Sequence, residues 1–283
     1  MKHRYSDSLW IGAKGLVRNY AISGRGLFFL CSKVWQGYLH TPISMSNLID
    51  ANFDFHSDTP TGKDPDSYSP TLRRYHKILW SKPLPNGLRF DLTDTTPKVY
   101  LHHQSELGEF FLSSDSIAHS YSRLKRMSHI INHIPSKEID SFFSLSSTIG
   151  GYIIFPSNKV ANQMTINGAR GFNPKILDRF DLTLECIRRH YLNEGSPLSD
   201  VLQRYSTFFS LFQDFQGYVD FFLLQDLVTE DYLSIKFYLP FDSFDNPPLP
   251  SNVHEYLSYK NNMTNFVLAR NHRILISRHW GGG

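Results

Sequence analysis

The chain has 283 residues, of which 41% are hydrophobic and 19% are charged, and its formal net charge is +3. This composition is that of an ordinary folded protein and excludes long disordered or collagen-like sequence. So small a net charge does not support general binding to nucleic acid. The apolar run at residues 27–31 is much shorter than a membrane span, so we expect a soluble protein with no membrane partner.

The first 45 residues differ in composition from the rest of the chain. Residues 1–40 contain six Lys or Arg side chains and one Asp. A targeting peptide, a basic arm, an ordinary structural element and translated upstream sequence all fit this pattern. We expect an extension over residues 1–45 that the folded core does not need, with Met45 as an alternative start, and then a single α+β domain over residues 46–280. The two cysteines, Cys31 and Cys186, favour a reducing compartment, the cytoplasm, over a disulfide framework.

The first predicted elements are a helix and three strands. Ser69 is a natural N-cap and Pro70 suits the first helical position, because its missing N–H needs no partner there. Strands are predicted at residues 88–92, 99–103 and 109–113, joined as a meander.

The second half of the chain is predicted to be mainly helical. Helices are expected at residues 117–133, 139–145, 173–193, 197–212, 217–228 and 252–276, and strands at residues 152–155, 164–167 and 235–239. Because strands cluster in the middle and helices gather at the end, the fold class is α+β: a central, mostly antiparallel sheet with helices packed on it and a helical C-terminal half.

Four phrases of the sequence resemble an uncharacterised protein family. They are SDTPTGKDPDSYSPTLRRYHKILWSKPLP, TINGARG, DRFDLTLECIRRHY and GYVDFFLLQDLV, and the resemblance covers nearly everything from Phe53 to Arg273. The chain is similar to a family of bacterial proteins that is known as a domain of unknown function. This resemblance implies a bacterial intracellular protein, and it carries over no activity, cofactor or catalytic residue.

A glycine-flanked arginine is the first candidate ligand site. The stretch Gly168-Ala169-Arg170-Gly171 is predicted as a turn before a helix that Asn173 caps. Backbone N–H groups at the start of a helix, together with a guanidinium, can bind an anion. In the alternative, Arg170 pairs with Asp178 or Asp181 of its own helix and has only a structural role. The candidate ligand-binding residues are Arg170, Gly168, Gly171, Lys63 and Arg73.

Two adjacent histidines on a predicted strand are the first candidate catalytic residues. Strand alternation sends His102 and His103 to opposite faces, so only one of them can point into a given pocket. A histidine oriented by a carboxylate such as Glu109 can act as a general acid or base near neutral pH. The bland alternative is a half-buried histidine that bonds to backbone or solvent.

Neither a metal nor a cofactor is expected. His129 and His133 have the spacing of helical metal ligands, but no third ligand accompanies them. The aspartates at 58, 64 and 66 lack the alternating ligands of a calcium loop and are interpreted as turn formers and caps.

Two further groups of side chains are interpreted structurally. The aromatic run from Phe208 to Phe222 is expected to be core, since polar residues interrupt it at helical spacing. Five residues near the C-terminus are interpreted as a basic tail that suits a helix end; they are Arg270, His272, Arg273, Arg278 and His279.

The leading functional hypothesis is an enzyme that acts on a phosphate-bearing substrate, a nucleotide or a nucleic-acid end, by His/carboxylate acid–base chemistry. The alternative is a non-catalytic interaction module of a bacterial complex or of a stress or defence system. The missing catalytic signature and the aromatic richness of the chain motivate that alternative.

Overall fold

A four-stranded antiparallel sheet runs through the middle of the chain. The computed structural model describes residues 49–94 and 101–277, which all belong to one compact unit. The sheet has the order β3-β4-β5-β6, with β3 (Thr93–Asp94), β4 (Leu101–Ser105), β5 (Gly108–Ser116) and β6 (Tyr152–Pro156). A separate hairpin pairs β1 (Lys82–Pro83) with β2 (Arg89–Phe90). Strands β4 and β5 of the predicted meander pair as expected, whereas the strand predicted at 88–92 is only β2, which lies outside this sheet. The α+β fold class is confirmed.

Ten α-helices occur among the described residues. They are α1 (Pro65–Tyr68), α2 (Pro70–Trp80), α3 (Ser128–Ile131), α4 (Ser136–Ser146), α5 (Ile166–Phe172), α6 (Phe180–Tyr191), α7 (Ser199–Arg204), α8 (Ser206–Ser210), α9 (Phe215–Phe221) and α10 (Val253–Ser277). Single turns of 3-10 helix are η2 (Phe55–Asp58), η3 (Lys125–Met127), η4 (Ile149–Gly151), η5 (Val160–Asn162) and η6 (Gln225–Leu227). None of the described helices is long and apolar enough to cross a membrane.

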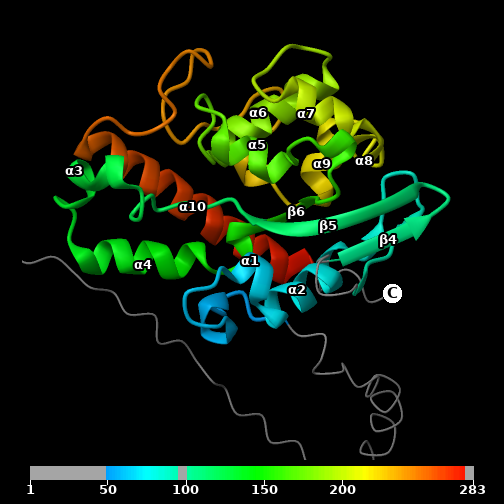
Figure 1. Cartoon of the computed structure of the whole chain (residues 1–283), viewed down its shortest axis with the longest axis horizontal. Helices are drawn as coiled ribbons and strands as arrows, with labels where there is room; N and C mark the ends of the chain where they lie inside the picture. The colour runs from blue at the N-terminus through cyan, green and yellow to red at the C-terminus, as the bar shows by residue number, and fades with distance from the viewer. Residues whose placement is uncertain (1–48, 95–100, 278–283) are drawn as a thin grey trace, which may run out of the picture. The chain divides into compact units, whose positions relative to one another are not determined.

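The helices lie on both sides of the sheet. Helices α5 to α9 gather on one side of it, whereas α1 and α2 lie on the other (Figure 1). Helix α10 packs against η4 and α4, so the last element of the fold lies beside the segment that leads into β6. Helix α2 begins as predicted, because the Ser69 hydroxyl accepts a hydrogen bond of 3.1 Å from the N–H of Leu72.

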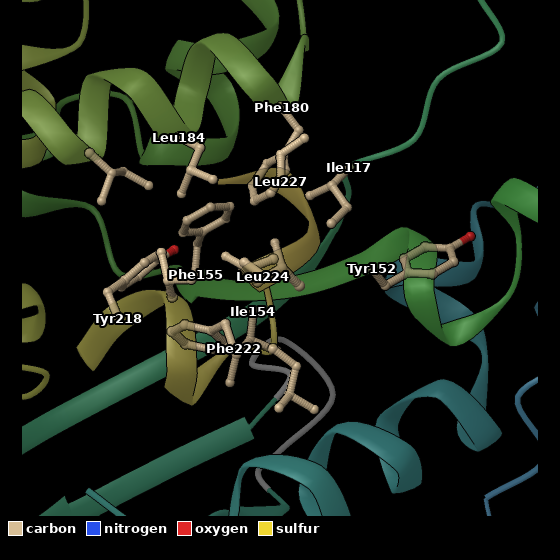
Figure 2. Packing of buried hydrophobic residues seen from close by; sticks show 14 of the residues in the cluster. Ile117, Tyr152, Ile154, Phe155, Phe180, Leu184, Tyr218, Phe222, Leu224 and Leu227 are labelled. Atoms are coloured by element: carbon tan, nitrogen blue, oxygen red, sulfur yellow. The ribbon is translucent and has the colours of Figure 1, made fainter. Parts of the chain in front are cut away.

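The core is centred on β6, whose five residues are all buried. Phe155 and Ile154 of this strand lie among side chains from α6 and α9, as Figure 2 shows for Leu184, Tyr218 and Phe222. The aromatic run from 208 to 222 is confirmed as core; Phe208, Phe212, Phe215, Tyr218, Phe221 and Phe222 are all buried. Tyr152, at the start of the strand, belongs to the same cluster but lies apart from these side chains (Figure 2), and its ring centroid is 5.6 Å from that of Phe55.

The region around the glycine-flanked arginine differs from the prediction. The stretch at 164–167 is not a strand, because Thr165 N-caps α5 and its hydroxyl accepts from the N–H of Gly168. The GARG stretch therefore lies inside a short helix. The next helix begins at Phe180 rather than near Asn173, because Leu177 and Asp178 have φ values of 47° and 63°, in the left-handed region that breaks a helix.

Other predicted boundaries are also corrected. The helix expected at 117–133 is replaced by a loop, η3 and the single turn α3. The helix expected at 197–212 is divided into α7 and α8, the helix expected at 217–228 is the shorter α9, and the strand expected at 235–239 contributes one isolated bridge, Val228 to Ile235. The helices expected at 117–133 and 217–228 are interrupted at Tyr121 and Leu223, whose φ values of 54° and 56° lie in the left-handed region.

The interpretation of the C-terminal cations as a basic tail is wrong for two of them. Arg270 is fully buried and Arg273 pairs with Asp226. Arg278 and His279 lie outside the described residues, as does the proposed extension over residues 1–45.

Candidate functional site

A cavity of about 610 Å³ opens where several separate parts of the chain meet. Its walls come from η2 and the segment around α1, the end of β5 with the loop that follows it, the end of α4, the start of β6 and the segment from α5 to Asp178. Polar and apolar side chains both line it, and more apolar than polar surface faces the cavity. Its titratable members are His56, Asp64, Asp66, Asp115, His119, Tyr121, Arg123, Tyr152 and Asp178.

Asp115, near the end of β5, is the central carboxylate of this cavity. Burial raises the pKa of Asp115 to about 7, against the opposing effect of Arg170, and the charges of Asp178 and Asp66 raise it further. Asp66 belongs to α1 and Asp178 precedes α6, so only the tertiary fold brings their charges close to Asp115.

Arg170 lies behind Asp115 rather than in the cavity. Its side chain is fully buried and forms an ion pair with the Asp115 carboxylate. Its Nε donates to Thr183 Oγ1 at 3.0 Å and its Nη2 to the backbone oxygen of Asp178 at 3.3 Å. With these contacts the guanidinium presents no open face to an external anion.

The alternative pairing proposed for Arg170 is also corrected. The carboxylate that it contacts belongs to β5, not to its own helical region. Asp181 instead forms a buried ion pair with Arg179, and Asp178 offers Arg170 only its backbone oxygen.

A strained turn places the Asp178 carboxylate in the cavity wall. The positive φ values of Leu177 and Asp178 are costly for non-glycine residues, and neighbouring groups hold the turn in place. The Tyr121 hydroxyl donates to the Leu177 oxygen at 2.9 Å, and the Asp178 N–H donates to the Arg170 oxygen at 3.1 Å. A Cβ on Gly171 would lie 3.2 Å from the Asp178 carboxylate, so the glycine permits this close approach.

His119, in the loop after β5, is neutral and has a defined tautomer. Its Nε2 lies 3.1 Å from the backbone oxygen of Ser116. Because a carbonyl oxygen can only accept, Nε2 carries the proton and Nδ1 is left as an acceptor. Burial lowers the pKa of His119, as does the Arg170 charge, while Asp178 opposes this shift. The ring stacks on Tyr121, with centroids 6.1 Å apart.

Two buried oxygen atoms of the lining residues have no hydrogen-bond partner among the described residues. They are Oδ1 of Asp66 and Oδ1 of Asn167. Burial, with the nearby Asp64 charge, raises the pKa of the Asp66 carboxyl. Since unsatisfied buried acceptors are rare in folded proteins, these two atoms are suited to a donor from outside the chain.

His102 and Glu109 do meet, but outside this cavity. His102 Nε2 lies 2.9 Å from Glu109 Oε1 across the β4–β5 pair, where half of the Glu109 side chain is exposed. His103 points to the opposite face, as predicted, and is buried. Its ring nitrogens lie 2.8 Å from the Asp91 backbone oxygen and 2.8 Å from Ser105 Oγ. His103 therefore fits the alternative interpretation, a histidine that bonds to the backbone and has no catalytic role.

The other sequence candidates are dispersed. Gly168 and Gly171 line the cavity, whereas Lys63 and Arg73 do not. Lys63 is exposed, with its Nζ 5.3 Å from the centre of the Tyr68 ring, and Arg73 is half-buried on α2. Within residues 49–94 and 101–277, no group of three or more His, Cys, Asp or Glu side chains is arranged to hold a metal ion.

Comparison with known proteins gives a family match. The model of a family of unknown function (DUF6994) matches residues 49–274. The chain belongs to this family. Every residue that lines the cavity lies inside the DUF6994 region. No curated protein and no solved structure matches the chain.

Sequence reasoning missed the central residues of the site in this DUF6994 protein. Asp66 was interpreted as a turn former, and Asp115 and His119 were not singled out. The polar stretch SSDSIAHSYS, at the end of a predicted strand, could have indicated these residues. It was instead assigned in part to the helix predicted from residue 117. Recognising it as a loop would have placed a histidine and a carboxylate beside the strand end.

Proposed function

We propose that this DUF6994 protein is an enzyme and that the cavity around Asp115 and His119 is its active site. The observation that carries the proposal is the convergence of a neutral histidine with the carboxyl groups of Asp66, Asp115 and Asp178 on one cavity. Titratable groups with shifted pKa values in a cleft are the usual marks of a catalytic site.

The environment of each group suggests its role. His119 is the general base, because its neutral ring offers Nδ1 as a proton acceptor. Asp115 is the general acid, because a carboxyl with a pKa of about 7 still holds a proton near neutral pH. Arg170 is a positioning residue that holds Asp115 from behind.

A phosphate-bearing substrate remains part of the proposal, but with a different cation. Arg123 is exposed and lines the cavity, and its guanidinium lies 5.4 Å from the centre of the Phe143 ring. An exposed guanidinium at the edge of the site can receive a phosphate that the acidic interior would repel. The proposed substrates are nucleotides or nucleic-acid ends.

The test is an activity screen with matched variants. The purified chain is incubated with nucleoside mono-, di- and triphosphates and with a 5′-phosphorylated oligonucleotide, and turnover is followed by phosphorus and proton NMR. We expect His119→Asn and Asp115→Asn to lower kcat by a factor of about 100 or more, the usual contribution of a general acid or base. His254→Asn, an exposed histidine on α10, is the control.

The pH profile gives a second readout. As pH rises through about 7, Asp115 loses the proton that it must donate, so kcat/KM should fall with an apparent pKa near that value. Because kcat/KM reports the free enzyme, Asp115→Asn should remove this inflection from any residual activity. Activity that depends on His102 and Glu109 instead of His119 would overturn the assignment.

We also propose a cytoplasmic location and a bacterial source. Within the described residues the single cysteine, Cys186, is buried and free, as expected in a reducing compartment. The group of titratable side chains that lines the cavity favours the enzyme over a non-catalytic interaction module.

A further inference from the structure

We infer that the cavity takes a nucleoside, with its base stacked on Phe172 and its sugar hydroxyls donating to Asp66 and Asn167. This inference rests on the proposed function, since it names the part of the substrate that enters the same site. It assigns a binding role to residues that the acid–base proposal does not use.

Phe172 is the exposed aromatic residue of the cavity wall. It ends α5, lines the cavity and is 79% exposed. The other aromatic lining residues already have neighbours: His56 and Arg123 lie close to the Phe143 ring, His119 stacks on Tyr121, and Tyr152 is buried. A single exposed apolar side chain is common on protein surfaces, so the functional argument for Phe172 depends on its place in the cavity lining.

Two oxygen atoms of cavity-lining residues can accept hydrogen bonds from a ligand. Asp66 Oδ1 and Asn167 Oδ1 are buried acceptors without a described partner. The Asn167 amide is oriented by donation from its Nδ2 to Ser113 Oγ at 3.2 Å, which directs the nitrogen away and leaves the oxygen as an acceptor. Hydroxyl groups of a sugar satisfy such acceptors, whereas a phosphate brings more acceptors and more negative charge.

A nucleoside contains both a flat base that can stack on Phe172 and sugar hydroxyls that can donate to Asp66 and Asn167. A base stacks on an aromatic side chain without requiring a particular sequence of hydrogen bonds. Carboxylates bind ribose hydroxyls in many nucleotide sites. A cavity of about 610 Å³ falls within the range of small-molecule sites. A bare sugar would use the acceptors but not the exposed ring of Phe172.

The experiment measures binding rather than turnover. Isothermal titration calorimetry on the full chain compares adenosine with 2′,3′-dideoxyadenosine, which lacks two hydroxyl donors, and with methyl β-D-ribofuranoside, which lacks the base. We expect adenosine to bind at millimolar concentration or below, and each of the other ligands to bind at least about tenfold more weakly.

Variants separate stacking from a general loss of structure. Phe172→Ala should weaken adenosine binding about tenfold and Phe172→Tyr should restore it, because the tyrosine ring offers the same stacking face. Leu192→Ala, at another exposed apolar residue, should leave binding unchanged. Equal affinity of adenosine for Phe172→Ala and the unaltered chain overturns the inference, as does equal affinity for adenosine and its dideoxy analogue.

The result also distinguishes this inference from the proposed function. Adenosine binding by His119→Asn, together with no His119-dependent turnover of any substrate, keeps the nucleoside site and removes the acid–base enzyme. Turnover that requires His119 and Asp115, together with no adenosine binding, keeps the enzyme and removes the nucleoside site.

Discussion

Three arginines of the described part of the chain are buried in the interior, and each has a different set of partners. Arg170 pairs with Asp115, and Arg179 pairs with Asp181 and donates to the Pro248 oxygen at 2.9 Å. Arg270 has no carboxylate partner among the described residues and donates only to backbone oxygens. A buried charge lowers the stability of the folded state unless it is paired. Removing one member of such a pair is therefore much more destabilising than removing both.

The Arg170–Asp115 pair provides a prediction at this scale. Arg170→Met should lower the free energy of unfolding by about 3–5 kcal/mol at pH 8, because the Asp115 carboxylate is then buried without its partner. Urea denaturation would measure this. The double variant Arg170→Met with Asp115→Asn, which removes the stranded charge, should recover a substantial part of the loss.

The pH dependence of that variant follows from the same charge. Without Arg170, the folded-state pKa of Asp115 rises further above its unfolded value. The folded variant then holds a proton above pH 7, where the unaltered protein has lost it, so the penalty should shrink as pH falls from 8 to about 7 and change little from there to pH 5. A penalty that is constant over this range would show that lost packing, not charge, causes it.

At the scale of single elements, close contacts decide where helices can lie. A Cβ on Gly217 of α9 would be only 2.1 Å from the backbone oxygen of Phe212, and the Gly217 N–H donates to Asp214 Oδ1 at 2.7 Å. The glycine therefore lets α9 fold back tightly on the segment after α8.

We predict that Gly217→Ala lowers the free energy of unfolding by about 2–3 kcal/mol, although alanine is the better helix former. Gly195→Ala is the matched control, because nothing lies within 4 Å of its added Cβ. That control should change stability by no more than about 0.5 kcal/mol. Thermal unfolding followed by circular dichroism would compare the two, and equal stability would contradict the close-contact argument.

At the scale of the whole molecule, Arg270 joins elements that are far apart in sequence. It lies on α10 and donates to the oxygens of Gly150, Tyr152 and Phe222, at the start of β6 and the end of α9. Its guanidinium also lies 5.9 Å from the centre of the Trp80 ring on α2. Burial lowers its pKa to about 10, so it stays charged at neutral pH.

Arg270→Met should destabilise the fold by about 3 kcal/mol or more, because it leaves several buried carbonyl oxygens without donors. Arg273→Met is the matched change one turn along α10, at a partly exposed pair with Asp226, and should cost less than about 1 kcal/mol. Urea denaturation followed by tryptophan fluorescence is the measurement. Similar losses in both variants would mean that Arg270 does not join the elements as proposed.

Local patterns determined the elements with strong local signals. Ser69 and Pro70 fixed the start of α2, alternation predicted β4 and β5, and the run before Pro156 predicted β6. These features depend on residues a few positions apart, and their physical causes, capping and strand alternation, are readable along the chain. The i to i+3 and i to i+4 pairs of Glu185 with the arginines after it belong to the same class.

Only the tertiary structure decided what Arg170, Asp115 and His119 do. Arg170 could be recognised as unusual in the sequence, but its partner lies 55 positions away on β5. The raised pKa of Asp115 requires burial together with charges from two other segments, and the tautomer of His119 depends on a loop that was predicted as helix. Burial and electrostatic coupling depend on distance in space, which the order of residues alone does not supply.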